Sequence, residues 1–155
     1  MSVQQSFEQL ISLAIQREEE AYEFYTQASE EAALQSSGKL LLELAKQEIG
    51  HKEKLMDALD ADVCTTFTCT TIAEIEDAGL SKYLVDIPLK SDSTPQEILV
   101  VAIKREEGAN AFYKALSELT GVANHRTVFE TLAKEEQRHK EILQQLYDDH
   151  FQPDN

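Results

Sequence analysis

Apolar residues recur along the first third of the chain at alternating spacings of three and four, the period of an amphipathic α-helix. One such stripe predicts a helix from about Gln4 to Ala33, and the next predicts a helix from about Ser37 to Leu59. The polar stretch QSSG at positions 35–38 is the expected turn between them. The first stripe runs through Phe7, Ile11, Ala14, Glu18, Ala21, Tyr25, Ala28 and Ala32, and the second through Leu41, Leu44, Glu48, His51, Leu55 and Ala58.

The same pattern returns 88 residues later without a gap, so the chain is an internal duplication. The repeated segments are AIQREEEAYEFY (14–25) with AIKREEGANAFY (102–113), and LAKQEIGHKEKL (44–55) with LAKEEQRHKEIL (132–143). In the second copy Thr94 is the expected cap of a helix that begins at Pro95 and ends near Gly121. A last helix is expected from about Asn124 to Asp149. The stripes here pass through Leu99, Ala102, Glu106, Ala109, Tyr113 and Leu116, and through Phe129, Leu132, Glu136, His139, Leu143 and Leu146.

Residues 60–93 connect the two copies and contain a β-rich piece, VCTTFTCT, followed by a short amphipathic helix expected at Ile72–Ala78. A connection of this length can travel the length of a bundle and let the second and third helices run parallel. The sequence therefore predicts one all-α domain over residues 1–155. Its architecture is a four-helix bundle of two duplicated hairpins, about 4–59 and 94–149, joined by a long crossover.

Six polar residues interrupt the apolar stripes and are therefore expected to point into the bundle. They are Glu18, Glu48, His51, Glu106, Glu136 and His139. Counted in residues from the connection between the two helices of each hairpin, they lie at similar heights along the bundle, within about one helical turn of each other. A buried ionised carboxylate without a partner is costly, and two divalent cations would balance four of them. Carboxylates together with imidazoles suit iron, manganese or zinc, so the pattern predicts a di-metal site.

These residues resemble the ferritin-like superfamily, and most closely its rubrerythrin branch. The resemblance rests on ExxAxxFY, which occurs at Glu18–Tyr25 and at Glu106–Tyr113, and on LAxxExxH, which leads to His51 and to His139. It covers both hairpins and leaves only the crossover outside.

The resemblance implies a role for each ligand. Glu48 and Glu136 are expected to bridge two iron ions. The remaining ligands are expected to be terminal, with Glu18 and His51 on one ion and Glu106 and His139 on the other. The aromatic residues Tyr25 and Tyr113 lie on the same stripes as the terminal glutamates. Two interpretations are open for them: their hydroxyls hydrogen-bond the carboxylates, or the side chains are ordinary core residues with satisfied hydroxyls. Glu135, beside Glu136, is expected to be exposed.

The function that the resemblance implies is a peroxidase-like di-iron oxidoreductase. It would reduce hydrogen peroxide or dioxygen with electrons from a separate donor protein. Rubrerythrins carry a further glutamate three residues after the third-helix ligand, but that position is Ala109 here. Two alternatives remain: a ferroxidase or iron-handling protein, and a non-enzymatic bundle with a structural di-metal site. Manganese and zinc are the alternative metals.

Composition limits the classes of molecule that the protein is expected to bind. The chain has 29 acidic and 14 basic residues and a net charge of −15, which disfavours nucleic acid and anionic membrane surfaces. The N-terminal MSVQQSFEQL lacks the pattern of a signal peptide, so a cytoplasmic protein is expected. Cys64 and Cys69 are expected to be free thiols, and no role is assigned to them. We expect a homodimer, as is common for helical bundles of this type.

Overall fold

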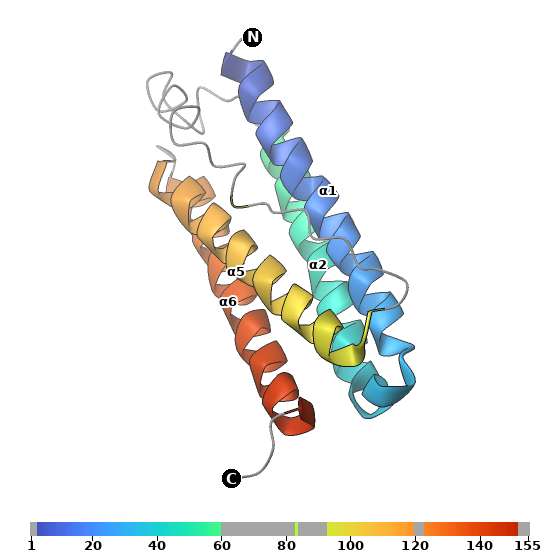
Figure 1. Cartoon of the computed structure of the whole chain (residues 1–155). Helices are drawn as coiled ribbons and strands as arrows, with labels where there is room; N and C mark the ends of the chain where they lie inside the picture. Colours follow the sequence, from blue (N-terminus) through green and yellow to red (C-terminus); the bar gives the residue numbers. More distant parts are fainter. Residues whose placement is uncertain (1–2, 60–82, 84–92, 120–122, 152–155) are drawn as a thin grey trace.

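The computed structural model describes residues 3–59, 83, 93–119 and 123–151 of the 155-residue chain. These residues form two helical hairpins (Figure 1). The first hairpin consists of α1 (Val3–Ser29), the short 3-10 helix η1 (Ala32–Ser37) and α2 (Gly38–Leu59). The second consists of α5 (Pro95–Leu119) and α6 (Ala123–Phe151). The prediction of an all-α four-helix bundle of two hairpins is confirmed.

The helix directions follow from the long crossover. In Figure 1, α2 ends at the end of the bundle where α1 begins, whereas α5 begins at the opposite end, beside η1. The helices α2 and α5 therefore run parallel, as a connection of this length allows. The β-rich piece with Cys64 and Cys69 and the short helix expected at Ile72–Ala78 lie outside the described residues.

The helix boundaries are close to the predicted ones except at the connection between α1 and α2. The prediction that the first helix continues to Ala33 is wrong, because α1 ends at Ser29. A tight turn follows the helix. The amide of Glu31 donates to the carbonyl of Ala28 at 3.2 Å, and Glu31 itself has extended φ and ψ angles. The fully buried Leu34 lies in η1 and packs into the core, so the turn is tightened around an apolar anchor.

The start of α5 shows the expected cap. The backbone amide of Glu97 donates to Oγ1 of Thr94 at 3.2 Å, which satisfies one of the amides left free at a helix start. Pro95 is the first helical residue, where its missing amide costs nothing.

The core is divided into two apolar clusters along the bundle. Members of the first cluster are Ile11, Ala14, Leu55, Phe112, Tyr113, Leu116, Phe129, Leu132 and Ala133. The second is composed of Phe24, Tyr25, Ala28, Leu34, Leu41, Leu44, Ala45, Ile98, Leu99, Ala102, Leu143 and Leu146. On each helix the buried glutamates and histidines lie in sequence between the residues of one cluster and those of the other, so the polar layer is enclosed by apolar packing at both ends.

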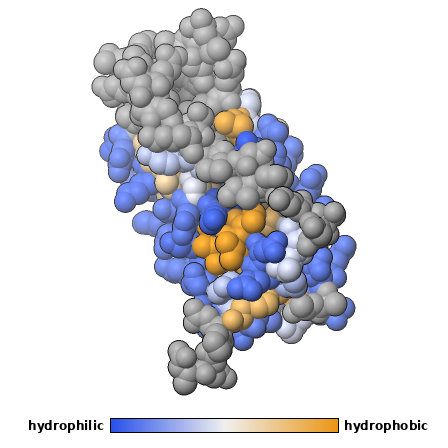
Figure 2. Space-filling view, viewed as in Figure 1, coloured by the Kyte–Doolittle hydropathy of each residue, from blue (hydrophilic) through white to orange (hydrophobic). Residues whose placement is uncertain are grey.

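The outer surface is of a different character. Among the coloured residues in Figure 2, most are hydrophilic, and hydrophobic residues gather near the centre of the view; the hydrophilic majority agrees with a strongly acidic chain. Among the described helices, none combines the length and the apolar character needed to cross a membrane.

Candidate metal centre

The six polar residues of the stripes meet in the middle of the bundle, and each is at most 3% exposed. Spacing explains how the helices present them. In α2 and again in α6, a glutamate and a histidine three residues apart lie on the same face. The other two glutamates come from α1 and α5. The set is Glu18, Glu48, His51, Glu106, Glu136 and His139.

Their ligand atoms form two overlapping groups of four. The first group is Glu18, Glu48, His51 and Glu136, and the second is Glu48, Glu106, Glu136 and His139. Within each group one nitrogen or oxygen atom of every residue lies within 4.8 Å of the others. Glu48 and Glu136 belong to both groups, whereas each remaining glutamate and histidine belongs to one.

Both imidazole rings turn Nδ1 toward the carboxylates. In the ring of His51 this atom is 2.7 Å from Oε1 of Glu136, and in the ring of His139 it is 2.8 Å from Oε1 of Glu48. Each Nδ1 thus approaches a glutamate of the opposite hairpin. The two rings are nearly parallel, with centroids 5.7 Å apart and planes inclined by 12°.

Several atoms of the cluster lack a hydrogen-bond partner. Among the described residues, the buried side-chain atoms without one are Oε2 of Glu18, Glu48 and Glu106, Oε1 of Glu136 and Nδ1 of His51. The close approach of His51 to Glu136 is not aligned as a hydrogen bond, so proximity does not satisfy these atoms. Leaving buried polar atoms unpaired is costly, and bound cations would satisfy all five. The oxygen and nitrogen donors therefore fit a pair of transition-metal ions.

The electrostatics of the metal-free cluster favour bound protons. Burial raises the pKa of the Glu18 carboxyl to about 8, and the charge of Glu48 adds to this. Burial also raises the pKa of Glu136 well above its usual range, helped by the charges of Glu106 and Glu48. Burial lowers the pKa of His139, but the neighbouring carboxylates of Glu106 and Glu48 outweigh it and raise that pKa to about 9. Metal ions would have to displace these protons.

Glu48 is the exception among these carboxylates. Burial and the charge of Glu106 raise its pKa, but the close approach of Glu18, His139 and His51 outweighs them, and the pKa is lowered. The surroundings therefore favour the ionised form of Glu48 more than that of Glu18. An ionised carboxylate at the centre of both groups is suited to attract the first cation.

Two tyrosines tie the hairpins together across the cluster. The hydroxyl of Tyr25 on α1 donates to Oε1 of Glu106 on α5. Reciprocally, the hydroxyl of Tyr113 on α5 donates to Oε1 of Glu18 on α1, at 2.5 Å. Burial and the charge of the bonded glutamate raise the pKa of each tyrosine well above its ordinary value, so both remain protonated donors.

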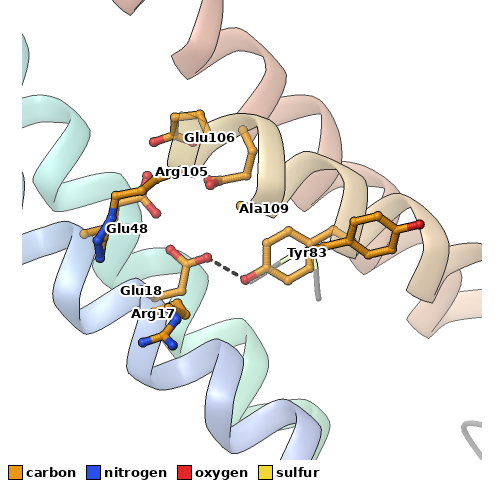
Figure 3. A pocket seen from close by; sticks show the side chains of 10 residues that line it. Arg17, Glu18, Glu48, Tyr83, Arg105, Glu106 and Ala109 are labelled. Atoms are coloured by element: carbon orange, nitrogen blue, oxygen red, sulfur yellow. Dashed lines mark hydrogen bonds between the residues drawn. The ribbon is translucent and has the colours of Figure 1, made fainter. Parts of the chain in front are cut away.

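A cavity of about 30 Å³ adjoins the cluster, and its lining includes the four glutamates but neither histidine. Figure 3 shows Glu18, Glu48 and Glu106 around it. It has room for roughly one or two water-sized groups. Ala21 and Ala109, each three residues after a terminal glutamate, leave this space open. The lining residues are Arg17, Glu18, Ala21, Glu48, Tyr83, Arg105, Glu106, Ala109, Tyr113 and Glu136.

Sequence reasoning missed the arginines of this cavity. Arg17 and Arg105 both contact Glu20, with closest nitrogen–oxygen distances of 2.8 and 3.2 Å. The duplication offered a signal, since the two arginines occupy equivalent positions directly before the terminal glutamates. Tyr83 of the crossover also lines the cavity, but no periodic pattern marked it.

The expectation that Glu135 is simply exposed is wrong. Its side chain is 37% exposed, but its Oε2 contacts Nε2 of His51. The reason is helix packing: α2 and α6 lie side by side at the cluster, so Glu135 reaches the outer edge of the histidine ring.

A comparison with protein families agrees with this arrangement of residues. The family model described as rubrerythrin matches residues 3–63 and 97–155, which together make up most of the chain and include all six polar residues of the cluster. No curated protein and no solved structure matches the chain. The buried carboxylate and histidine cluster fits a di-iron protein of this type. The chain therefore belongs to the rubrerythrin family.

Proposed function

We propose that the protein is a di-iron oxidoreductase that reduces hydrogen peroxide with electrons from a separate donor protein. The observation that carries this proposal is the pair of overlapping ligand groups that share Glu48 and Glu136. Membership of the rubrerythrin family supports iron as the metal.

The two shared glutamates would bridge the metal ions. Glu18 and His51 would complete one position, and Glu106 and His139 the other, because each pair occurs in only one of the two groups. Once ionised, the four carboxylates would balance the charge of two divalent ions. When bound, the iron pair supplies the two electrons that split peroxide.

The protein's own residues supply access and protons. The cavity beside Glu18 and Glu106 is of the size of a two-oxygen molecule, and Ala109 leaves it open. The Tyr113 hydroxyl donates to Glu18 and lines this cavity, so it holds one proton at its Oη atom on the cavity wall. Reduction of peroxide to two waters consumes two protons with the two electrons, so a hydroxyl that carries a proton in the lining of the cavity suits the reaction.

Ferroxidase activity is the second candidate, and one observation favours it. Ala109 stands where the family's further glutamate would be, so the ligand set is limited to the six residues of the cluster. A site without that additional carboxylate is less suited to shift its ligands between oxidation states, but it can still oxidise ferrous ions that pass through it.

Iron loading separates these functions. Metal-free protein receives two equivalents of Fe²⁺ without oxygen and is then mixed with one equivalent of peroxide or of dioxygen. For a peroxide reductase we expect near-ultraviolet absorbance to develop within seconds with peroxide, far more slowly with dioxygen, and to bleach reversibly with reductant. Continued oxidation of many Fe²⁺ ions per chain would indicate a ferroxidase. A protein isolated with zinc, and spectrally silent to both oxidants, would contradict both.

A further inference from the structure

The two histidines of the cluster contact different groups through Nε2, the ring nitrogen that faces away from the carboxylates. Nε2 of His51 contacts the carboxylate of Glu135 on α6. Nε2 of His139 contacts Oε1 of the Gln47 amide on α2, at 2.6 Å. In both rings Nδ1 faces the carboxylates, so Nε2 is the outer atom, and its proton can be donated to the oxygen behind it.

The duplication makes this an internal comparison. Gln47 and Glu135 occupy equivalent positions in the two hairpins, directly before the shared glutamates Glu48 and Glu136. The ligand types are the same in both halves, each with one glutamate and one histidine of its own. The partners of Nε2 differ, however: a carboxylate contacts His51, and an amide contacts His139.

Hydrogen bonds to a charged acceptor are about twice as strong as those to a neutral one. A carboxylate behind an imidazole fixes the ring and makes its other nitrogen a better metal donor, whereas an amide oxygen does this more weakly. Glu135 is also anchored, because its Oε1 lies 3.8 Å from Nζ of Lys54. Its partial exposure weakens the effect through solvent screening.

We propose that Glu135 and Gln47 are positioning residues that make the two metal positions unequal. The position of Glu18 and His51, backed by Glu135, binds its metal more tightly and fills first. The position of Glu106 and His139, backed by Gln47, is the weaker and fills second. This inference depends on the proposed metal centre but not on peroxide chemistry.

Metal titration of the metal-free protein tests the proposal without an activity assay. We would titrate with Co²⁺, follow its absorbance, and measure affinities by competition with a chelator of known strength. Wild-type protein should bind two equivalents in two steps. Glu135→Gln, which places an amide behind both histidines, should weaken the first step about tenfold, the lower end of the range for such partners. Gln47→Glu, which places a carboxylate behind both, should strengthen the second step by a similar factor.

Three controls fix the interpretation. His51→Ala should abolish the tighter step and His139→Ala the weaker one, which assigns the steps to the two halves. Glu130→Gln, an exposed residue of the same helix as Glu135, should leave both steps unchanged. Circular dichroism of the metal-free variants shows whether they are folded, and Gln47→Glu still tests the proposal if Glu135→Gln fails to fold. Unchanged isotherms in the two partner variants would overturn the inequality of the positions. Binding of less than two equivalents by wild type would instead refute the metal centre itself.

Discussion

At the scale of single residues, the site depends on burial more than on residue type. Each hairpin contains many glutamates, but among those whose side chains the structure describes, only the ones on the apolar stripe are buried. Glu136 and the exposed Glu130 lie on the same helix and differ in this respect alone. The consequence is that neighbouring positions of α6 respond very differently to the same substitution.

We predict that Glu136→Ala removes metal binding and that Glu130→Ala does not. Glu136 belongs to both ligand groups, so its loss affects both metal positions at once. Because partners behind a ligand already contribute about 10- to 100-fold in affinity, loss of a shared ligand should cost more than about 100-fold. Elemental analysis after equilibration with Fe²⁺ or Zn²⁺ measures this. Equal metal contents in the two variants would contradict the assignment of the buried face.

A second residue-scale prediction concerns the cavity. Ala109→Leu should fill it and weaken the binding of azide to the metal-loaded protein about tenfold or more, since the side chain occupies the space of the incoming ligand. Metal content should stay at two ions. Absorbance titration with azide measures the effect, and Ala111→Leu on the same helix, outside the cavity lining, is the matched control. Tight azide binding in Ala109→Leu would show that small ligands enter elsewhere.

At the scale of elements, two glycines in the interiors of helices, Gly50 and Gly108, have different surroundings. A Cβ atom on Gly50 of α2 would meet nothing within 4 Å, whereas one on Gly108 of α5 would lie 2.3 Å from the carbonyl oxygen of Tyr83. Gly108 thus lets the backbone of Tyr83 lie directly against α5, next to Ala109 and the cavity.

We predict opposite effects of the same substitution at these glycines. Gly50→Ala should stabilise the protein by about 1 kcal/mol, the usual gain in helix propensity. Gly108→Ala should destabilise it by about 1 kcal/mol or more, because the clash with a backbone atom outweighs that gain. Urea unfolding of both variants gives the two free energies. Stabilisation by Gly108→Ala would mean that the crossover moves away from α5 at little cost.

The difference between the two glycines also shows where sequence reasoning reaches its limit. The six polar residues were identifiable because helical periodicity and duplication both act along the chain. The contacts of Glu135 with His51 and of Tyr83 with Gly108 join distant segments, and no local pattern encodes them. The early end of α1 was missed for a related reason, since packing of Leu34 into the core decides it.

At the scale of the whole molecule, the cluster sets the balance between the metal-free and metal-bound states. Four carboxylates in the middle of the bundle destabilise it unless protons or cations neutralise them. Protons can do so only while the pH lies below the raised pKa values of the folded state.

We predict that the metal-free protein loses stability as the pH rises from about 4.5 to about 9. Folding raises the pKa of Glu18 from 4.5 to about 8 and that of His139 from 6.5 to about 9. In these intervals the folded state holds protons that the unfolded state has released, so unfolding becomes easier with rising pH. Thermal unfolding between pH 5 and 9 measures the trend.

Bound metal should reverse this dependence. Metal ions compete with the same protons, so the stabilisation on adding Zn²⁺ or Mn²⁺ should increase with pH. At a free concentration about 100 times the dissociation constant, the gain should be about 2.7 kcal/mol for one site. A metal-free protein whose stability rises toward pH 9 would contradict the protonation of the cluster.

The reciprocal bonds of Tyr25 and Tyr113 have a consequence for how the centre is put together. Each hairpin contributes one terminal glutamate, one shared glutamate, one histidine and the tyrosine that holds the opposite terminal glutamate. Neither half can therefore assemble a metal position alone. Two identical copies of either hairpin, associated about a twofold axis, would supply the same set of six ligands, and the crossover makes this pairing intramolecular and independent of protein concentration.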